Sequence, residues 1–331
     1  MKILILDSAQ IRELLPMQAC IELMADALSA LARGEVFQPL RMITRPPDSP
    51  GLLGLMPAYR AGEDGAFGLK AICVFPGNPA QGKDAHQGAV VLFSRETGEL
   101  LALMNASEIT ATRTAAVSAV ATRLLAREEA ANLAIIGAGV QARTHLTALA
   151  CVRSIKNARV ACRNIEHAHQ LVDEMQAKVA FPIEVVRTNE EAVRDADLIV
   201  TATSSFEPVI NKDWIAPGAH VNAIGTHSPQ SREIDSGTMA VARIFVDRRE
   251  SALNEAGDYL LAAKEGIVTP DSILGEIGEL LTGARAGRGS ETEITLFKSL
   301  GLAIEDVACA DYLFRQATTQ NTGTWVNWGS T

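Results

Sequence analysis

The sequence predicts an α/β protein built from two different parts. From about residue 131 onward, short apolar segments of strand length alternate with helical segments, which is typical of a parallel sheet covered by helices on both faces. Before residue 105, strand-like segments follow one another with Gly and Pro between them, which is typical of hairpins. We therefore expect a doubly wound parallel sheet of the Rossmann type, preceded by an α+β part with mainly antiparallel strands.

The first part should begin with a helix and continue as a sheet. Apolar residues at helical spacing predict an amphipathic helix that starts near Pro16 and stops at Gly34. The loop Arg95–Gly98 predicts a hairpin. The strands expected in this part span residues 39–45, 51–56, 68–75, 88–94 and 99–104.

A long alanine-rich helix should link the two parts. It begins at Asn105–Glu108, which resembles a capping box, and it runs to about Ala126. Strands of the second part are expected near Leu133, Val160, Ile183, Leu198, Val221 and Ile244.

The domain boundaries follow from the end of this alternation. From residue 258 to residue 313 the pattern is helical, and the polar tail 316–331 can return to the first part. The 331 residues are enough for two domains. We therefore assign residues 1–113 plus 314–331 to the first domain and residues 114–313 to the second.

The segment Leu133–Ala142 predicts a phosphate-binding turn between a strand and a helix. Gly137 permits a tight turn, Gly139 lets the backbone approach a pyrophosphate, and Ala142 allows close packing of helix on strand. The N–H groups at the start of the helix then face the anion. A lone glycine turn of this kind often only joins strand to helix, so the motif needs a second feature.

That second feature is the end of the next strand, Asn157–Cys162, about 20 residues beyond the glycines, where the adenosine ribose lies in dinucleotide-binding folds. An acidic residue there would bind the ribose 2′-hydroxyl of NAD. This chain has Cys162, Arg163 and Asn164 instead, and a guanidinium favours a 2′-phosphate. We expect NADP as the preferred cofactor, with NAD possible; the alternative is that Arg163 is a solvated loop arginine.

Composition limits the partners. The formal net charge is −9 and there is no basic run, which argues against nucleic acid and anionic membrane surfaces. The apolar run at the N-terminus is too short for a signal peptide, and no stretch is apolar enough to span a bilayer, so we expect a cytoplasmic protein. The five cysteines and six histidines are scattered, and we predict no disulfide framework and no metal site.

Three cations stand out in the first domain and its linking helix because their neighbours are apolar or small: Arg41, Lys70 and Arg113. Arg offers a planar fork for a carboxylate, and Lys offers a point charge whose pKa falls when it is desolvated. Together they suit an amino-acid-like or imino-acid-like substrate. Taken separately, each has an ordinary explanation as a snorkelling lysine or an ion-paired helix arginine.

A set of segments resembles the ornithine cyclodeaminase/μ-crystallin family, in order and over nearly the whole chain. The 109–116 segment, Ile-Thr-Ala-Thr-Arg-Thr-Ala-Ala, followed by the glycine turn is the most specific part of the match. The matching segments are 56–59, 68–70, 97–100, 109–116, 136–142, 201–205, 275–279 and 295–301.

The resemblance implies a homodimer whose N-terminal domains, used for substrate binding and dimerisation, join their sheets, with an active site beside an NAD(P)-binding Rossmann domain. It implies that Arg41, Lys70 and Arg113 hold the substrate carboxylate, with Lys70 close to the reacting carbon. With the motif, it implies a cofactor site made of Thr114, Gly137, Ala138, Gly139, Val140, Gln141, Cys162, Arg163, Asn164, Thr201, Ala202, Thr203, Ser204, Ser205, Ile224 and Gly225.

One departure from the family pattern concerns the loop after the strand at Val221. The cyclodeaminase and an alanine dehydrogenase of the family carry an aspartate there that handles the substrate amine, whereas this chain has His227. A histidine gives no permanent anion, which counts against ornithine, but it can shuttle a proton or donate to a second carboxylate. Alternatively His227 only caps its loop.

These features predict an NAD(P)H-dependent oxidoreductase that reduces a 2-imino acid to the amino acid, a ketimine reductase of amino-acid metabolism. Pyrroline-2-carboxylate, piperideine-2-carboxylate and acyclic imino acids all remain open as substrates. The alternatives are an ornithine cyclodeaminase that uses bound NAD, an alanine-type amino-acid dehydrogenase, and a non-catalytic crystallin-like protein that binds a small ligand.

Overall fold

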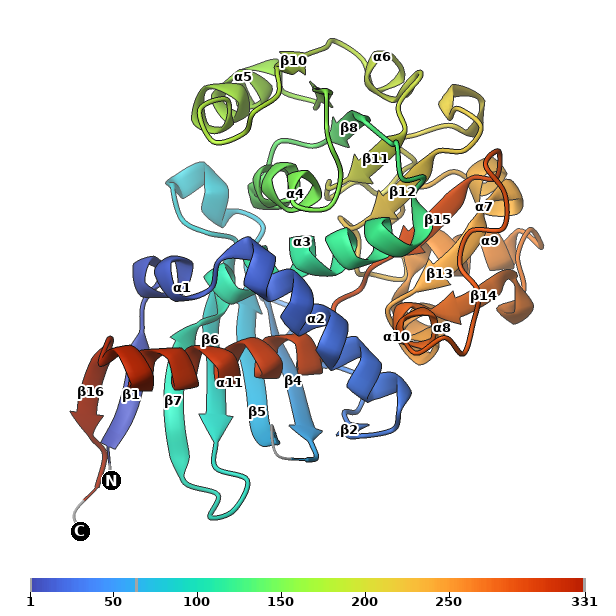
Figure 1. Cartoon of the computed structure of the whole chain (residues 1–331). Helices are drawn as coiled ribbons and strands as arrows, with labels where there is room; N and C mark the ends of the chain where they lie inside the picture. Colours follow the sequence, from blue (N-terminus) through green and yellow to red (C-terminus); the bar gives the residue numbers. More distant parts are fainter. Residues whose placement is uncertain (1, 63–64, 330–331) are drawn as a thin grey trace. The chain divides into compact units, whose positions relative to one another are not determined.

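The computed structural model describes residues 2–62 and 65–329, and it divides into two compact units (Figure 1). The first unit comprises Met1–Arg113 and Leu302–Thr331, and the second comprises Thr114–Gly301. The ends of the expected first domain, residues 1, 330 and 331, lie outside the described residues.

One expected boundary is wrong. Residues 302–313 were expected in the second domain, but they belong to the first unit as part of helix α11 (Ala303–Gln320). The reason is tertiary, because α11 packs against α2 (Met17–Ala32) and against strands of the first sheet, and a helical pattern does not show which sheet a helix covers.

The first unit is a mixed sheet with helices on one face. The sheet order is β16-β1-β7-β6-β5-β4-β2, with β3 paired to β4. β1 runs parallel to β7, and the other pairs are antiparallel, including β16 of the tail with β1. Figure 1 shows α2 and α11 lying across the same face of this sheet. The strands are β1 (Lys2–Leu6), β2 (Val36–Phe37), β3 (Met42–Thr44), β4 (Leu52–Arg60), β5 (Ala66–Val74), β6 (His86–Phe93), β7 (Leu100–Asn105) and β16 (Thr324–Asn327), and the remaining helices are α1 (Ser8–Leu14) and η1 (Asn78–Gln81).

Strand β5 explains how closely α11 approaches the sheet. Its even-numbered residues from Ala66 to Ile72 alternate with less buried odd-numbered ones, as expected for a strand with one covered face. A Cβ on Gly68 would lie 2.5 Å from a methyl carbon of Val307 in α11. Glycine at this position therefore sets the distance between helix and sheet, and it brings the start of α11 next to Lys70.

The second unit is the expected doubly wound parallel sheet. Its order is β10-β9-β8-β11-β12-β15-β13-β14, and these neighbouring strands pair in parallel. The strand order reverses between β8 and β11, and ligands of such sheets bind at this switch point. The strands are β8 (Asn132–Ile136), β9 (Asn157–Ala161), β10 (Ile183–Val185), β11 (Leu198–Thr201), β12 (His220–Ala223), β13 (Arg243–Val246), β14 (Ile273–Glu276) and β15 (Thr295–Lys298).

Two of these strands, β14 and β15, lie in the stretch expected to be helical. Each has only four residues, and β15 is buried along its whole length between β12 and β13. A short apolar run with no exposed face carries no period-2 signal, so periodicity alone does not separate it from a buried helix. The helices of this unit are α4 (Val140–Ala150), α5 (Ile165–Met175), α6 (Asn189–Val193), η2 (Lys212–Trp214), α7 (Ser236–Val241), α8 (Arg249–Glu255), α9 (Gly257–Lys264), η3 (Pro270–Ser272) and α10 (Ile277–Leu281), and α3 (Ala106–Leu125) contains the boundary between the units.

The core of the second unit lies on both faces of its sheet. Ala134 and Ile136 of β8 belong to one cluster of buried residues, whereas Leu133 and Ile135 belong to another. Neighbouring residues of a strand point to opposite faces, so each cluster fills one side. This is the packing that a doubly wound sheet requires.

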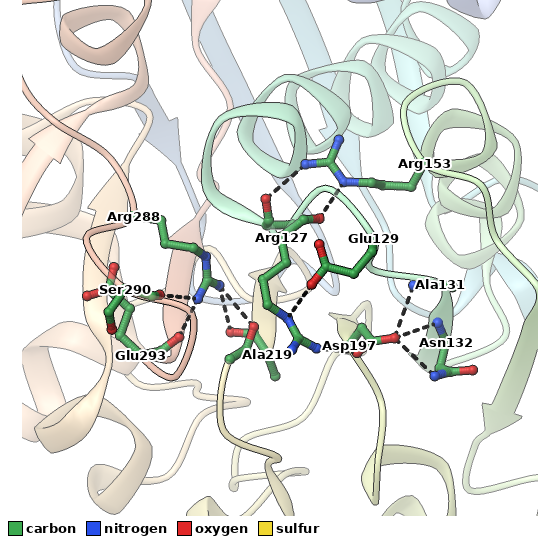
Figure 2. Close-up of polar contacts among 12 residues, drawn as sticks. Arg127, Glu129, Ala131, Asn132, Arg153, Asp197, Ala219, Arg288, Ser290 and Glu293 are labelled. Atoms are coloured by element: carbon green, nitrogen blue, oxygen red, sulfur yellow. Dashed lines mark hydrogen bonds and ion pairs between the residues drawn. The ribbon is translucent and has the colours of Figure 1, made fainter.

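Arginine side chains hold the end of α3 within the second unit, and Figure 2 shows one of them, Arg153, at the carbonyl oxygen of Arg127. Arg153 donates to the carbonyl oxygens of Thr122, Ala126 and Arg127, each at 2.9 Å, and Arg288 donates to that of Leu125 at 2.7 Å. The last carbonyls of a helix lack partners within the helix, and cations there also meet the negative end of the helix dipole. Arg127 in turn pairs with Asp197, whose carboxylate accepts from the backbone at the start of β8 (Figure 2).

Among the described residues, no single helix is long and apolar enough to cross a membrane. Only α1 and α2 taken together, with an 81° bend between them, have the length and composition for it. No group of three or more His, Cys, Asp or Glu side chains in the same part of the chain is arranged to hold a metal ion.

Candidate active site

The first unit buries two cations against two acids. The Nζ atom of Lys70 lies 2.7 Å from Oδ2 of Asp306, and Arg113 reaches Oδ1 of Asp306 at 3.1 Å and Oε2 of Glu305 at 2.7 Å. The side chains of the two acids are fully buried, and those of Lys70 and Arg113 are 3% and 5% exposed. Lys70 also donates to the hydroxyl of Thr110 at 3.5 Å.

Local structure accounts for this cluster. Lys70 is on the face of β5 that the helices cover, two residues after Gly68, where α11 comes closest. Glu305 and Asp306 lie in the first turn of α11, where acids are favoured by the helix dipole. Arg113 comes from α3, so three elements of the first unit meet at one point.

Burial and charge change the proton affinities in this cluster. Desolvation, together with the positive charges of Arg113 and Arg41, lowers the pKa of Lys70 to about 8, although Asp306 opposes this shift. Desolvation also works against the charge of Arg113, but Asp306 and Glu305 outweigh it and raise the Arg113 pKa. Lys70 and Arg113 therefore meet at Asp306, and the charge of Arg41, from the same unit, also acts on Lys70.

The sequence analysis missed the two acids and one histidine. Glu305 and Asp306 are adjacent acids in an otherwise apolar run from Leu302 to Ala310, and that break in the pattern was the available signal. His86 lies on the same face of the sheet as Lys70, because Val90, which pairs with Lys70, and His86 are four residues apart on β6. Burial and the charges of Lys70 and Arg113 lower the His86 pKa, although Asp84 opposes them.

The glycine turn of the second unit fits a pyrophosphate. Gly137 has φ +116°, and a Cβ there would lie 2.4 Å from the carbonyl oxygen of Ala202. Gly139 is the N-cap of α4, and no described atom lies within 4 Å of the position that its Cβ would take. Ala142 is fully buried. The turn therefore has the tight bend, the open approach and the close helix packing that the motif requires.

Two loops at the carboxyl ends of β11 and β12 share one buried carboxylate. Glu233 accepts from the backbone N–H and the hydroxyl of Thr203 at 2.7 and 2.8 Å. It also accepts from the N–H of Gly225 at 2.7 Å and the hydroxyl of Thr201 at 3.0 Å. Glu233 thus joins the expected nicotinamide loop to Gly225, and the N–H of Ile224 donates to the carbonyl of Thr201.

A buried ion pair contacts the backbone of the loop after β12. Lys298 of β15 is 2.8 Å from Asp258 and donates to the carbonyl oxygen of Thr226 at 2.8 Å. Asp258 accepts from the backbone N–H groups of Glu233 and Ile234. Lys298 and Asp258 therefore hold the backbone immediately before His227, whose own side chain is exposed.

The expected ribose-binding residues divide into structural and exposed ones. Asn164 is the N-cap of α5 and accepts from the N–H of Glu166, and the thiol of Cys162 donates to the carbonyl of Asn164 at 2.9 Å. Arg163, between them, is exposed. The remaining expected cofactor residues lie as follows: Thr114 is buried, Ala138, Gln141, Ala202 and Ser205 are half-buried, and Val140 and Ser204 are exposed.

A parallel sheet with a glycine turn at its switch point, together with a unit that buries cations of the carboxylate-binding type, defines a two-unit α/β protein of the dinucleotide-binding class. A model of the ornithine cyclodeaminase/mu-crystallin family matches residues 1–321, and the chain belongs to this family.

Relatives with known activities resemble the chain over most of its length. The ketimine reductase mu-crystallin of Mus musculus is 40% identical over 281 residues, which is 85% of each chain. The structure of Thermococcus litoralis Δ1-pyrroline-2-carboxylate reductase in complex with NADH and L-proline is 37% identical, with a TM-score of 0.95 over 97% of this chain and 99% of that one. An archaeal alanine dehydrogenase dimer with bound NAD is 32% identical, with a TM-score of 0.93 over 99% of this chain and 100% of that one.

Proposed function

We propose that the protein is an NAD(P)H-dependent reductase of 2-imino acids. The observation that carries the proposal is the burial of Lys70 and Arg113 around Asp306, where desolvation first, and the charges of Arg113 and Arg41 after it, lower the pKa of Lys70 to about 8. Buried cations of this kind suit a carboxylate, and a lysine whose pKa is lowered toward the working pH suits proton transfer to an imine. The resemblance to a pyrroline-2-carboxylate reductase and a ketimine reductase supports the same chemistry.

The chain's own residues would hold the substrate and its proton. The arginines bind the carboxylate, with Lys70 as a further donor. Lys70 pairs with Asp306 at 2.7 Å and donates to the hydroxyl of Thr110 at 3.5 Å, so residues of the first unit hold its ammonium group in place. Lys70, or a water that it positions, keeps the imine nitrogen protonated, because an iminium carbon accepts a hydride far more readily than a neutral imine carbon. The nicotinamide cofactor, when bound, supplies the hydride.

The cofactor site would be the glycine turn with the loops that Glu233 joins. The open space at the Cβ position of Gly139 and the start of α4 suit the pyrophosphate, and the 201–205 and 224–225 loops suit the nicotinamide end. His227, exposed in the loop after β12, is the candidate for contact with the substrate's far end.

The substrate test is an NAD(P)H-oxidation screen over cyclic and acyclic 2-imino acids, the acyclic ones made from 2-oxo acids with ammonia or methylamine. We expect turnover of at least one cyclic 2-imino acid to the amino acid. Lys70→Met should abolish turnover while the cofactor still binds. Net release of ammonia from ornithine without added oxidant would support a cyclodeaminase instead.

We also propose a preference for NADPH, based on the exposed Arg163 at the end of β9. Arg163→Ala should weaken NADPH binding by about 1.5–3 kcal/mol, the value of a hydrogen bond to a charged group, and leave NADH binding nearly unchanged. The matched control is Arg194→Ala, which removes an exposed arginine of the same unit that pairs with Glu190. Equal losses for NADPH and NADH in Arg163→Ala would rule out the preference.

A homodimer formed through the first sheet is the third part of the proposal. The face of the sheet away from α2 and α11 carries an apolar row in which Leu69 pairs with Val91, Val91 with Leu103, and Leu103 with Ile5. Next to this row, Phe67 is 47% exposed and stacks on Tyr59 at 4.5 Å between ring centroids. Apolar patches of this kind mark interaction surfaces.

The assembly test is the molar mass in solution by light scattering. Val91→Glu should convert the dimer to a monomer. Val241→Glu, which places the same charge at a half-exposed apolar site of the second unit, should leave the dimer intact. A wild-type monomer, or a dimer that survives Val91→Glu, would contradict this part of the proposal.

A further inference from the structure

We propose that Asp306 is a positioning residue that holds the Lys70 ammonium group protonated and directed toward the substrate carboxylate, and that its neighbour Glu305 has no such role. The inference rests on the proposed function and extends it to a residue of α11. The two acids are adjacent and equally buried, so they form a natural pair for comparison.

The geometry separates their tasks. Asp306 bridges both cations, with Oδ2 on Lys70 at 2.7 Å and Oδ1 on Arg113 at 3.1 Å. Glu305 contacts Arg113 at 2.7 Å. Asp306 therefore contacts a group whose pKa is lowered toward the working pH range, whereas Glu305 forms an ion pair with an arginine, which stays charged.

All charged groups around Lys70 matter to this argument. Arg113 from α3 and Arg41 from the segment before β3 disfavour the ammonium form, and burial does the same. His86 of β6 also feels the charge of Lys70. Asp306 is the group that favours the charged form of Lys70 both by its charge and by a hydrogen bond. Without the Asp306 carboxylate, burial and the two guanidinium groups would lower the pKa of Lys70 further, because the largest opposing contribution would be lost.

The role has a consequence for catalysis. A neutral Lys70 neither attracts the substrate carboxylate nor donates a proton to the imine, so activity is lost at the pH where Lys70 becomes neutral. Loss of the Asp306 charge should move this alkaline loss of activity to lower pH. Removing an opposite charge in direct contact with a buried ammonium group lowers its proton affinity by roughly 10- to 1000-fold. Loss of the Glu305 charge should weaken Arg113 binding to α11 but leave the titration of Lys70 in place.

The experiment compares Asp306→Asn with Glu305→Gln in the full-length protein. Each change keeps the shape of the side chain and removes one charge. The first readout is the titration of Lys70, followed by NMR of lysine labelled with ¹³C at Cε and assigned with Lys70→Met. The second is the pH profile of kcat/KM with an imino acid and NADPH. Thermal melting reports on folding, and Asp306→Ser serves as the second variant if Asp306→Asn does not fold.

We expect Asp306→Asn to shift the Lys70 titration and the alkaline limb of kcat/KM to lower pH by the same amount, and to regain activity at lower pH, where Lys70 is protonated again. Glu305→Gln should move neither. Equal shifts in both variants, or no shift in Asp306→Asn, would overturn the proposal. If the wild type reduces no imino acid, the proposed function fails, while the NMR titration still decides whether Asp306 controls the charge of Lys70.

Discussion

Gly139→Ala separates the structural role of the glycine turn from its role in cofactor binding. Gly139 has φ −84° and ψ −167°, a backbone conformation open to any residue, and no described atom lies within 4 Å of the new Cβ. The fold should therefore tolerate alanine, with a change in the free energy of unfolding below about 1 kcal/mol. If a pyrophosphate lies against this glycine, the Cβ occupies its space and displaces the backbone hydrogen bonds to it.

The size of the binding defect follows from those hydrogen bonds. Each bond from an N–H to a charged group contributes about 1.5–3 kcal/mol, so loss of one raises the Kd of NAD(P)H by roughly 10- to 150-fold. The assay is a fluorescence titration of NADPH and NADH, with thermal unfolding of the same samples.

Gly137→Ala is the matched control. Its Cβ would lie 2.4 Å from the carbonyl oxygen of Ala202, and its φ of +116° is unfavourable for alanine. It should destabilise the protein by at least about 1–3 kcal/mol. If Gly139→Ala binds the cofactor as tightly as the wild type does, the pyrophosphate does not lie against Gly139. If the two changes destabilise the protein equally, a Cβ at Gly139 is not tolerated better than one at Gly137, and the structural argument is wrong.

Three further predictions concern the second unit. Lys298→Met leaves the buried Asp258 carboxylate without the cation 2.8 Å away and should lower the free energy of unfolding by about 3–5 kcal/mol, measured by urea denaturation. Adding Asp258→Asn to this variant should recover part of the lost stability. A loss below about 1 kcal/mol in Lys298→Met would contradict the prediction. Burial lowers the pKa of His145 to about 4, so between pH 6.5 and pH 4 the histidine is protonated in the unfolded chain but not in the folded one. The free energy of unfolding should therefore fall by up to about 3 kcal/mol as the pH is lowered through this range. His145→Gln should make this fall shallower, and an unchanged slope would mean that His145 is already charged in the folded state. Glu233→Gln, which replaces one of the two carboxyl oxygens that accept from Thr203 and Gly225, should weaken binding of NADH and NADPH alike, and a loss confined to NADPH would argue against its place at the nicotinamide loops.

Local patterns in the sequence were enough for much of this fold. The glycine turn at Gly137 and Gly139, the strands from Leu133 to Ile244 and the capping signal at Asn105 are set by neighbours in the chain, because turn conformation, strand alternation and helix starts depend on a few consecutive residues. The cations Arg41, Lys70 and Arg113 were visible as charges in apolar surroundings.

The partners of these cations depended on the tertiary structure. Asp306 lies far along the chain from Lys70, and the two meet because Gly68 lets α11 approach β5, a contact that no local spacing encodes. The same long-range packing moved the domain boundary to Leu302 and placed β15 in the middle of the second sheet.

The sequence by itself therefore determined the two kinds of sheet, the glycine turn between β8 and α4 and the candidate cations, since each is set by short-range chemistry. Only the tertiary structure decided that burial beside Asp306 and Arg113 lowers the pKa of Lys70 and that Glu233 links the loops after β11 and β12. Those properties come from burial and from charges brought together by folding, and neither exists in the unfolded chain.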